Sequence, residues 1–156
     1  MVLAGKLSTE LGIKTPVDKF FKLFASELHE VQNISERVHG AKLHEGEDWH
    51  HNDSVKHWTY VIDGKVHTCH ESIEVDEQNK KITFKLFGGD IDEHYKVFNL
   101  IIQVIDNGDG TGAAKWTVEY QKINEDIDPP NGWMDLLGKV TREVDAHLVK
   151  GTNIAL

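Results

Sequence analysis

The chain has 156 residues, of which 39% are hydrophobic and 28% are charged. This length and composition predict one folded domain over residues 1–156, large enough to bury a hydrophobic core without disulfides or metals. The formal net charge of −9, from 26 acidic residues against 17 Lys and Arg, disfavours binding to nucleic acids or anionic membranes.

The first part of the chain predicts a strand followed by a short helical segment. Residues 3–14 alternate imperfectly between polar and apolar side chains and contain the apolar residues of a first strand: Leu7, Leu11 and Ile13. The string Thr15-Pro16-Val17-Asp18 predicts a helix start, with a Thr cap, Pro in the first turn and an acid three residues after the cap. Apolar residues then follow at helical spacing: Val17, Phe20, Phe21, Phe24 and Leu28. A break near Asn33 leaves room for one helix or two short ones.

From residue 38 to residue 122 the pattern changes to strands separated by tight turns. Asp63-Gly64 lies between two strand-like runs and predicts a type I′ hairpin. Polar turns at 76–79 and 106–112 separate the runs that follow. Strands joined by such short turns are antiparallel, and no βαβ crossover is indicated.

Alternation along these strands predicts which side chains face the core. Three rows are expected to point inward: Ile82, Phe84 and Leu86; Phe98, Leu100, Ile102 and Val104; Trp116, Val118 and Tyr120. Trp58 and Tyr60 predict a fourth inward-facing row. The alternate residues of the same strand are the competing candidates for the inner face: Val55, His57, Thr59 and Val61.

The string Asp128-Pro129-Pro130 predicts the start of a long helix that ends at Gly151, with frayed residues beyond it. Its apolar stripe is Trp133, Leu137, Val140, Val144 and Leu148. A strand, a short helical segment, about six antiparallel strands and a long helix predict an α+β domain. Only the long helix is large enough to cover one face of the sheet, and a strongly twisted sheet curls around such a helix. Both an internal space and a solid core are compatible with this pattern.

Several short strings occur in order along nearly the whole chain: Gly5-Lys6-Leu7, His44-Glu45-Gly46-Glu47, the run from Trp58 to Lys65, Ile82-Thr83-Phe84-Lys85, Gly89-Asp90 followed by Tyr95-Lys96-Val97-Phe98, the run from Trp116 to Lys122, and Ala146-His147-Leu148. Together they resemble the major latex protein branch of the birch pollen major allergen superfamily of plants, the pathogenesis-related class ten proteins. The resemblance implies a seven-stranded, strongly curved antiparallel sheet around a long C-terminal helix. It also implies two short supporting helices and an internal hydrophobic cavity, an arrangement known as the helix-grip fold.

This resemblance implies binding of small lipophilic plant metabolites, for storage or transport, with a link to defence or stress. Hormones, sterols, flavonoids, fatty acids and alkaloids are the expected classes of ligand. Some relatives are enzymes, so a cofactor-free enzyme of specialised metabolism is the alternative, one that cyclises, condenses or isomerises a reactive terpenoid or alkaloid intermediate. A protein-interaction module without a small ligand is a third hypothesis.

The predicted wall of the cavity combines the inner rows with the helix stripe: Trp58, Tyr60, Ile82, Phe84, Leu86, Phe98, Leu100, Ile102, Trp116, Val118, Tyr120, Trp133, Leu136, Leu137, Val140, Thr141 and Val144. A cavity needs large apolar walls and a few polar groups that orient its guest. Tyr60, Tyr120, Thr141 and His67 are the candidate polar groups. If the protein is an enzyme, Tyr60, Tyr120 and His67 are the candidate acid–base residues, with Cys69 beside them.

We predict neither a metal nor a cofactor. His67 and Cys69 share one face of a strand, whereas His70 points to the other, so no compact site is built there. His50-His51 lie in the polar loop 45–54, which has one glycine where the superfamily has a glycine-rich loop. Its carboxylates repel phosphate, which weakens a nucleotide-binding or ribonuclease hypothesis.

The compartment is predicted from what the sequence lacks. No apolar run of a signal peptide precedes the first strand, and no stretch is long and apolar enough to cross a bilayer. A single cysteine, Cys69, excludes an intrachain disulfide and agrees with a reducing compartment. We therefore expect a cytoplasmic protein that does not insert into membranes.

Overall fold

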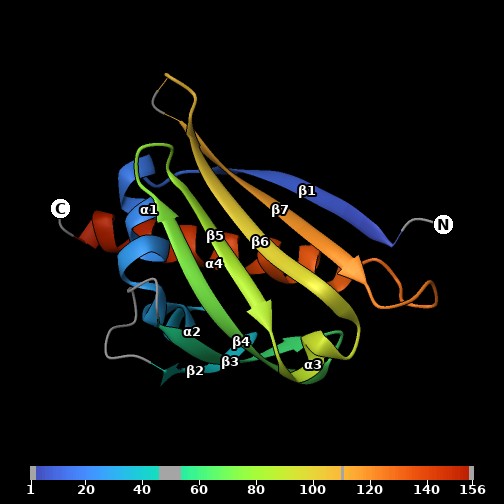
Figure 1. The fold of residues 1–156 in the computed structure, drawn as a ribbon. Helices are drawn as coiled ribbons and strands as arrows, with labels where there is room; N and C mark the ends of the chain where they lie inside the picture. Colours follow the sequence, from blue (N-terminus) through green and yellow to red (C-terminus); the bar gives the residue numbers. More distant parts are fainter. Residues whose placement is uncertain (1–2, 46–53, 110, 155–156) are drawn as a thin grey trace.

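Seven strands form one antiparallel sheet that curves around a long helix in the computed structural model, which describes residues 3–45, 54–109 and 111–154 (Figure 1). The strands are β1 (Ala4–Ile13), β2 (Val38–Glu45), β3 (Val55–Ile62), β4 (Lys65–Asp76), β5 (Lys81–Phe87), β6 (Tyr95–Asp106) and β7 (Gly112–Lys122). Their order across the sheet is β1-β7-β6-β5-β4-β3-β2, so β1 and β2 form the two edges. The predicted α+β architecture with seven antiparallel strands is confirmed.

Five helical segments accompany the sheet in the described part of the chain: α1 (Val17–Ser26), the 3-10 turn η1 (Leu28–Glu30), α2 (Val31–Ile34), α3 (Gly89–Asp92) and α4 (Asn131–Ile154). The long helix α4 lies along the concave face of the sheet, and α1 packs near its C-terminal half (Figure 1). The break expected near Asn33 lies at the end of α2. The short helix α3, between β5 and β6, was not predicted.

The β3–β4 hairpin turns at Asp63 and Gly64, whose φ angles are 53° and 77°. Positive φ at both central residues is the type I′ geometry, which matches the twist of the flanking strands. The predicted hairpin is therefore confirmed. It lies against the first turn of α4, where a Cβ on Gly132 would fall 2.5 Å from Ile62 Cγ2, so this close approach requires glycine.

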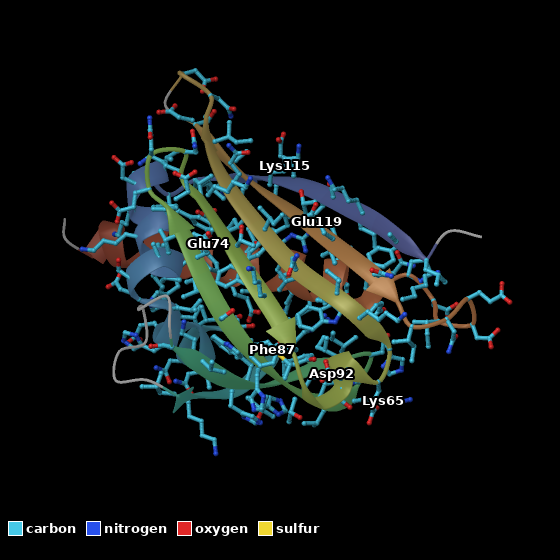
Figure 2. All side chains as sticks on the ribbon, in the orientation of Figure 1. Lys65, Glu74, Phe87, Asp92, Lys115 and Glu119 are labelled. Carbon is cyan, nitrogen blue, oxygen red and sulfur yellow. The ribbon has the colours of Figure 1, made fainter. Side chains whose placement is uncertain are left out.

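The predicted inner rows face α4. Tyr120 is partly buried. All the other members are buried: Trp58, Tyr60, Ile82, Phe84, Leu86, Phe98, Leu100, Ile102, Val104, Trp116 and Val118. The competition for the inner face of β3 is resolved in favour of Trp58 and Tyr60, and Lys56 joins them. The outer face is polar, and Figure 2 shows Glu74, Lys115 and Glu119 on that side of the sheet.

The start of α1 differs from the prediction. Thr15 does not cap the helix, because its hydroxyl donates a hydrogen bond of 2.6 Å to the Asp145 carboxylate of α4, and Pro16 occupies the cap position instead. The same carboxylate accepts the backbone N–H groups of Lys14 and Thr15. An ionised oxygen is a stronger acceptor than neutral partners, so the distant Asp145 outcompetes the local cap.

The end of α4 also differs from the prediction. The helix begins at Asn131, directly after Pro130, but it continues through Gly151 to Ile154. The prediction that it ends at Gly151 was wrong. Glycine inside a helix costs only about 1 kcal/mol relative to alanine, and it ends a helix only where the backbone takes up a left-handed turn.

A cluster of buried aromatic side chains lies where α1 meets α4 and the sheet. Phe20 is fully buried, and the Phe24 ring contacts Trp116 edge-on at 5.7 Å between centroids. The Trp116 indole N–H donates to Thr141 Oγ1 at 2.7 Å, and the Thr141 hydroxyl donates to the Leu137 carbonyl at 2.7 Å. The polar atoms in this region are therefore satisfied internally.

Candidate ligand-binding site

An apolar cavity of about 80 Å³ lies between the sheet and the helices, and we call it the inner cavity. Its walls come from every layer of the fold: Phe24, Leu28, Val31, Val38, Trp58, Tyr60, Cys69, Glu71, Phe84, Leu86, Leu100, Trp116, Trp133, Leu136, Leu137 and Val140. This volume is small beside the roughly 300–1,000 Å³ of pockets that enclose drug-sized ligands, so the space accepts a small chemical group rather than a whole sterol or flavonoid.

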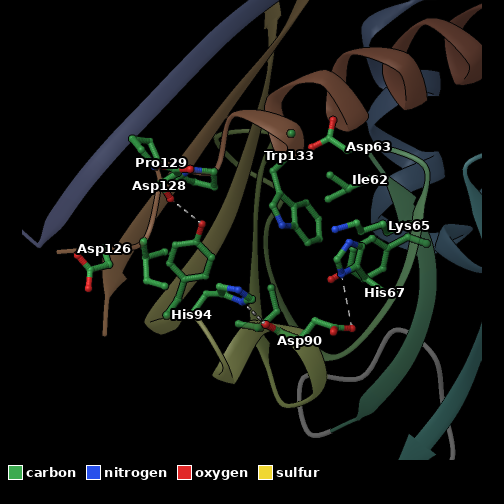
Figure 3. A pocket seen from close by; sticks show the side chains of 16 residues that line it. Ile62, Asp63, Lys65, His67, Asp90, His94, Asp126, Asp128, Pro129 and Trp133 are labelled. Carbon is green, nitrogen blue, oxygen red and sulfur yellow. Dashed lines mark hydrogen bonds and ion pairs between the residues drawn. The ribbon is translucent and has the colours of Figure 1, made fainter. Parts of the chain in front are cut away.

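A larger space of about 520 Å³, which we call the mouth cleft, opens at the N-terminal end of α4 (Figure 3). The β3–β4 hairpin, α3, the start of β6 and the β7–α4 connection surround it: Tyr60, Ile62, Asp63, Lys65, His67, Asp90, Ile91, His94, Tyr95, Asp126, Ile127, Asp128, Pro129, Pro130, Gly132 and Trp133. Its volume lies in the range of small-molecule pockets.

Tyr60 and Trp133 line both spaces. Their ring centroids are 4.8 Å apart, and the Trp133 ring also packs against Phe98 at 5.2 Å. Tyr60 belongs to strand β3 of the sheet, whereas Trp133 belongs to the first turn of α4. The two rings therefore form the wall between the mouth cleft and the inner cavity.

The mouth cleft is polar and predominantly acidic. Asp63, Asp126 and Asp128 surround it together with Asp90, whose carboxylate accepts the Thr68 N–H at 2.7 Å and lies 3.7 Å from His67 Nδ1. The Tyr95 hydroxyl donates to the Asp128 carbonyl at 3.2 Å (Figure 3). Burial, with the nearby Tyr120 and Asp128, raises the pKa of Tyr95 to about 12, so this phenol stays neutral at physiological pH.

A second group of titratable residues lies on β3 and β4, and three of its members, Tyr60, Cys69 and Glu71, line the inner cavity. Glu71 is 7% exposed and lies directly across from Lys56, which is fully buried. Burial raises the pKa of Glu71 to about 7, although the positive charge of Lys56 and the Trp58 indole oppose this shift. Burial also raises the pKa of the Cys69 thiol and of the Tyr60 phenol well above their usual ranges. These two groups are therefore neutral at physiological pH.

Sequence reasoning missed Lys56 and Glu71. Each of the two residues belongs to the set of alternate positions that face inward on its strand. Lys56 precedes Trp58 and Tyr60 by two and four positions, and Glu71 lies two positions from both Cys69 and Ile73. The alternation that identified the aromatic rows could have found them. A charged residue in a buried row is the signal, because such residues are rarely buried unless they are paired or functional.

The predicted wall residues divide into two sets. Ten of them line the inner cavity: Trp58, Tyr60, Phe84, Leu86, Leu100, Trp116, Trp133, Leu136, Leu137 and Val140. His67 lines the mouth cleft together with Tyr60 and Trp133. Seven others line neither space: Ile82, Phe98, Ile102, Val118, Tyr120, Thr141 and Val144.

Two of the predicted polar groups are placed away from both spaces. The Thr141 hydroxyl is engaged by Trp116 and Leu137. The Tyr120 hydroxyl lies over β1, where a Cβ on Gly5 would fall 2.5 Å from it. The ligand contacts and acid–base roles assigned to all these residues stay predictions.

The histidine pair His50-His51 and most of the glycine-poor loop fall on residues 46–53, outside the described residues. Within residues 3–45, 54–109 and 111–154, no three His, Cys, Asp or Glu side chains gather in a way that could hold a metal ion. None of the helices in these ranges combines the length and apolarity that a membrane crossing requires.

Comparison with known proteins decides the family. The model of the pathogenesis-related protein Bet v 1 family matches residues 2–151. The chain belongs to this family. MLP-like protein 43 of Arabidopsis thaliana is 37% identical over 150 residues, which cover 94% of each chain. MLP-like protein 28 of the same plant is 39% identical, but this chain spans only 44% of its length.

Solved structures agree with this Bet v 1 assignment. Major latex-like protein 151 of Panax ginseng superposes with a TM-score of 0.88 at 36% identity, covering 93% of this chain and 97% of that one. The resemblance to major latex proteins is thus confirmed. A Thalictrum norcoclaurine synthase point mutant in complex with a transition-state analogue has a TM-score of 0.72 at 15% identity over 94% and 98% of the two chains. That likeness shows a shared fold.

Proposed function

We propose that the protein binds a small lipophilic molecule whose body lies in the mouth cleft and whose end enters the inner cavity between Tyr60 and Trp133. The observation that carries this proposal is the pair of spaces divided by these two aromatic rings. Binding in storage or transport of a plant metabolite, linked to defence or stress and in the cytoplasm, agrees with membership of the family.

Access requires movement of the Trp133 ring. Tyr60 is almost wholly buried and stacks on His67 at 5.7 Å, so it is held on two sides. Trp133 is partly buried and belongs to the first turn of α4, next to Pro129 and Pro130 in the connection from β7. A guest that displaces Trp133 from Tyr60 joins about 80 Å³ of apolar space to the 520 Å³ outside.

The proposal is tested by titrating an uncharged hydrophobic dye, N-phenyl-1-naphthylamine, and by mapping its contacts with amide chemical shifts. We expect shifts at Tyr60, His94 and Trp133 and none at Lys115 on the outer face. Ile62→Asp puts a charge into the cleft wall and should weaken the dye about tenfold. The matched control is Val66→Asp on the same hairpin, because Val66 is 60% exposed and does not line the cleft. Equal effects of the two substitutions would contradict the proposal.

Catalysis is a second candidate function, because Tyr60, Cys69 and Glu71 stand together on the cavity wall. The pKa of Glu71, about 7, is suited to moving a proton near neutral pH. Such a group could assist the cyclisation or isomerisation of a reactive terpenoid or alkaloid intermediate without a cofactor.

The two inner tyrosines provide a matched test of this second candidate. Tyr60→Phe should lower turnover of added intermediates by about a hundredfold, as measured by mass spectrometry. Tyr120→Phe should leave turnover unchanged, since Tyr120 lines neither space. Full activity in Tyr60→Phe would remove this residue as an acid–base group.

A further inference from the structure

Glu71 is a carboxyl group in a predominantly apolar wall. Among the described residues, the inner cavity is lined by aliphatic and aromatic side chains, which include the Tyr60 phenol and the Trp58 indole, by the Cys69 thiol and by this one carboxyl group. Glu71 is 7% exposed, and its Oε1 atom is buried and accepts no hydrogen bond within the described part of the chain. A buried acceptor without a donor is costly, so such atoms in native proteins call for an explanation.

The position of Lys56 determines what the cavity presents to a guest. Lys56 and Glu71 are directly opposed in the β3–β4 register, but Glu71 lines the inner cavity and Lys56 does not. A guest therefore meets the carboxyl oxygen rather than the ammonium group. The neighbouring Lys56 already supplies a positive charge that compensates the carboxylate. The guest that best satisfies Oε1 of Glu71 is therefore a neutral hydrogen-bond donor rather than a second cation.

We propose that Glu71 accepts a hydrogen bond from a hydroxyl group of the guest, and that this contact selects lipophilic alcohols and phenols. A hydroxyl group fits a cavity of about 80 Å³, with the apolar body of the guest outside in the mouth cleft. Molecules that lack a donor leave Oε1 unsatisfied, and carboxylates bring a like charge toward Glu71. This inference rests on the proposed binding function and adds the chemical class of the guest.

Three naphthalene probes of nearly equal size test the inference by calorimetric titration of the full chain at pH 8, where the Glu71 carboxyl is mostly ionised because its pKa is about 7. They are 2-naphthol, which has a hydroxyl donor, 2-methoxynaphthalene, which has none, and 2-naphthoate, which is an anion. We expect wild type to bind the naphthol about tenfold more tightly than the methoxy compound, and to bind naphthoate most weakly. Glu71→Gln replaces a charged acceptor by a neutral one, and should reduce the naphthol preference to about threefold.

Two further variants keep this test decisive. Glu74→Gln makes the same chemical change on the same strand, but Glu74 is exposed on the outer face, so the tenfold preference should persist (Figure 2). The double variant Lys56→Met, Glu71→Met replaces the buried pair by apolar side chains of similar length, which proteins often tolerate. It should bind both probes equally, and it serves in place of Glu71→Gln if that variant fails to fold.

The outcomes separate this inference from the proposed function. If 2-methoxynaphthalene binds wild type but the naphthol has no advantage, or if the double variant retains the tenfold preference, Glu71 is not the acceptor and only this inference is overturned. If none of the probes binds wild type, the proposed binding function is overturned as well.

Discussion

The two ends of α4 are covered in opposite ways. At the C-terminal end, α1 packs directly against the helix and the sheet, and Asp145 ties the β1–α1 junction to α4 through three donors. At the N-terminal end, the cover consists of the β3–β4 hairpin, α3 and the β7–α4 connection, whose side chains include four aspartates. The first end contains the packed core around Phe20, which borders the inner cavity at Phe24 and Trp116, and the second contains the mouth cleft.

This difference indicates where a helix-grip fold leaves room for a ligand. A helix presents a continuous apolar stripe that interdigitates with a sheet and leaves few voids. Loops carry polar side chains that turn toward water, so they surround a space instead of filling it. The closed end should therefore carry the stability, and the open end should carry the binding.

The largest expected effect concerns Phe20 at the closed end. Phe20→Ala removes a fully buried ring and should lower the free energy of unfolding by about 3–5 kcal/mol, as measured by urea denaturation. Tyr95→Ala removes a half-buried ring at the mouth cleft and should cost only about 1–2 kcal/mol. Equal losses in the two variants would break the comparison between the ends.

The second effect concerns pH and the carboxyl group between the two ends. The pKa of Glu71 is about 7 in the folded protein against 4.5 as its reference value, so the folded state holds a proton that the unfolded chain releases between these pH values. Glu71 therefore contributes stability below pH 4.5 that is lost as pH rises through about 7, in total about 3 kcal/mol.

Urea titrations of wild type, Glu71→Gln and Glu74→Gln at several pH values measure this contribution. The difference between wild type and Glu71→Gln should change steadily over this range, whereas Glu74→Gln should follow wild type. A difference that stays constant with pH would show that the Glu71 carboxyl titrates normally.

A smaller effect separates two aspartates that occupy comparable places at the two ends. Asp145→Ala removes the acceptor for two backbone N–H groups and the Thr15 hydroxyl, and should cost about 2 kcal/mol. Asp90→Ala removes the acceptor for the Thr68 N–H at the open end, and should cost about 1 kcal/mol. Thermal unfolding measures both, and a reversed order would contradict the assignment of stability to the closed end.

The smallest effect is expected for an exposed ion pair in the second turn of α4. Arg37 Nη1 lies 3.0 Å from Asp135 Oδ2, but the Asp135 side chain is 73% exposed. Asp135→Asn should therefore change the free energy of unfolding by less than about 0.5 kcal/mol. A larger loss would mean that surface charges, in addition to packing, hold α4 in place.

Local patterns were sufficient to predict most of the fold. The Asp63-Gly64 turn, the inner aromatic rows and the Pro130 helix start depend on residues that are close in sequence, and all three are found in the structure. The bond between Thr15 and Asp145 joins residues 130 positions apart, so no local pattern could reveal that it replaces the helix cap.

The candidate site was harder to predict than the fold. Hydrophobic periodicity identifies inward side chains such as Ile82 and Leu100 equally, yet only Leu100 lines the inner cavity. The amount of free space depends on how neighbouring rings such as Tyr60 and Trp133 pack, and sequence pattern does not determine this. Lys56 and Glu71 were missed because hydrophobic periodicity identifies apolar and aromatic residues, and does not report charged residues that occupy the same alternate positions.

The position of β1 at the edge of the sheet has a consequence for the order of folding. Strands β2 to β7 each pair with their neighbours in sequence, whereas β1 pairs with β7, so that Ser8 meets Thr117, a residue 109 positions away in the sequence. Closing so long a loop costs entropy before any contact compensates for it. We therefore expect the β2–β7 meander to form first and β1 to join it late, so that substitutions in β1 accelerate unfolding and leave the folding rate nearly unchanged.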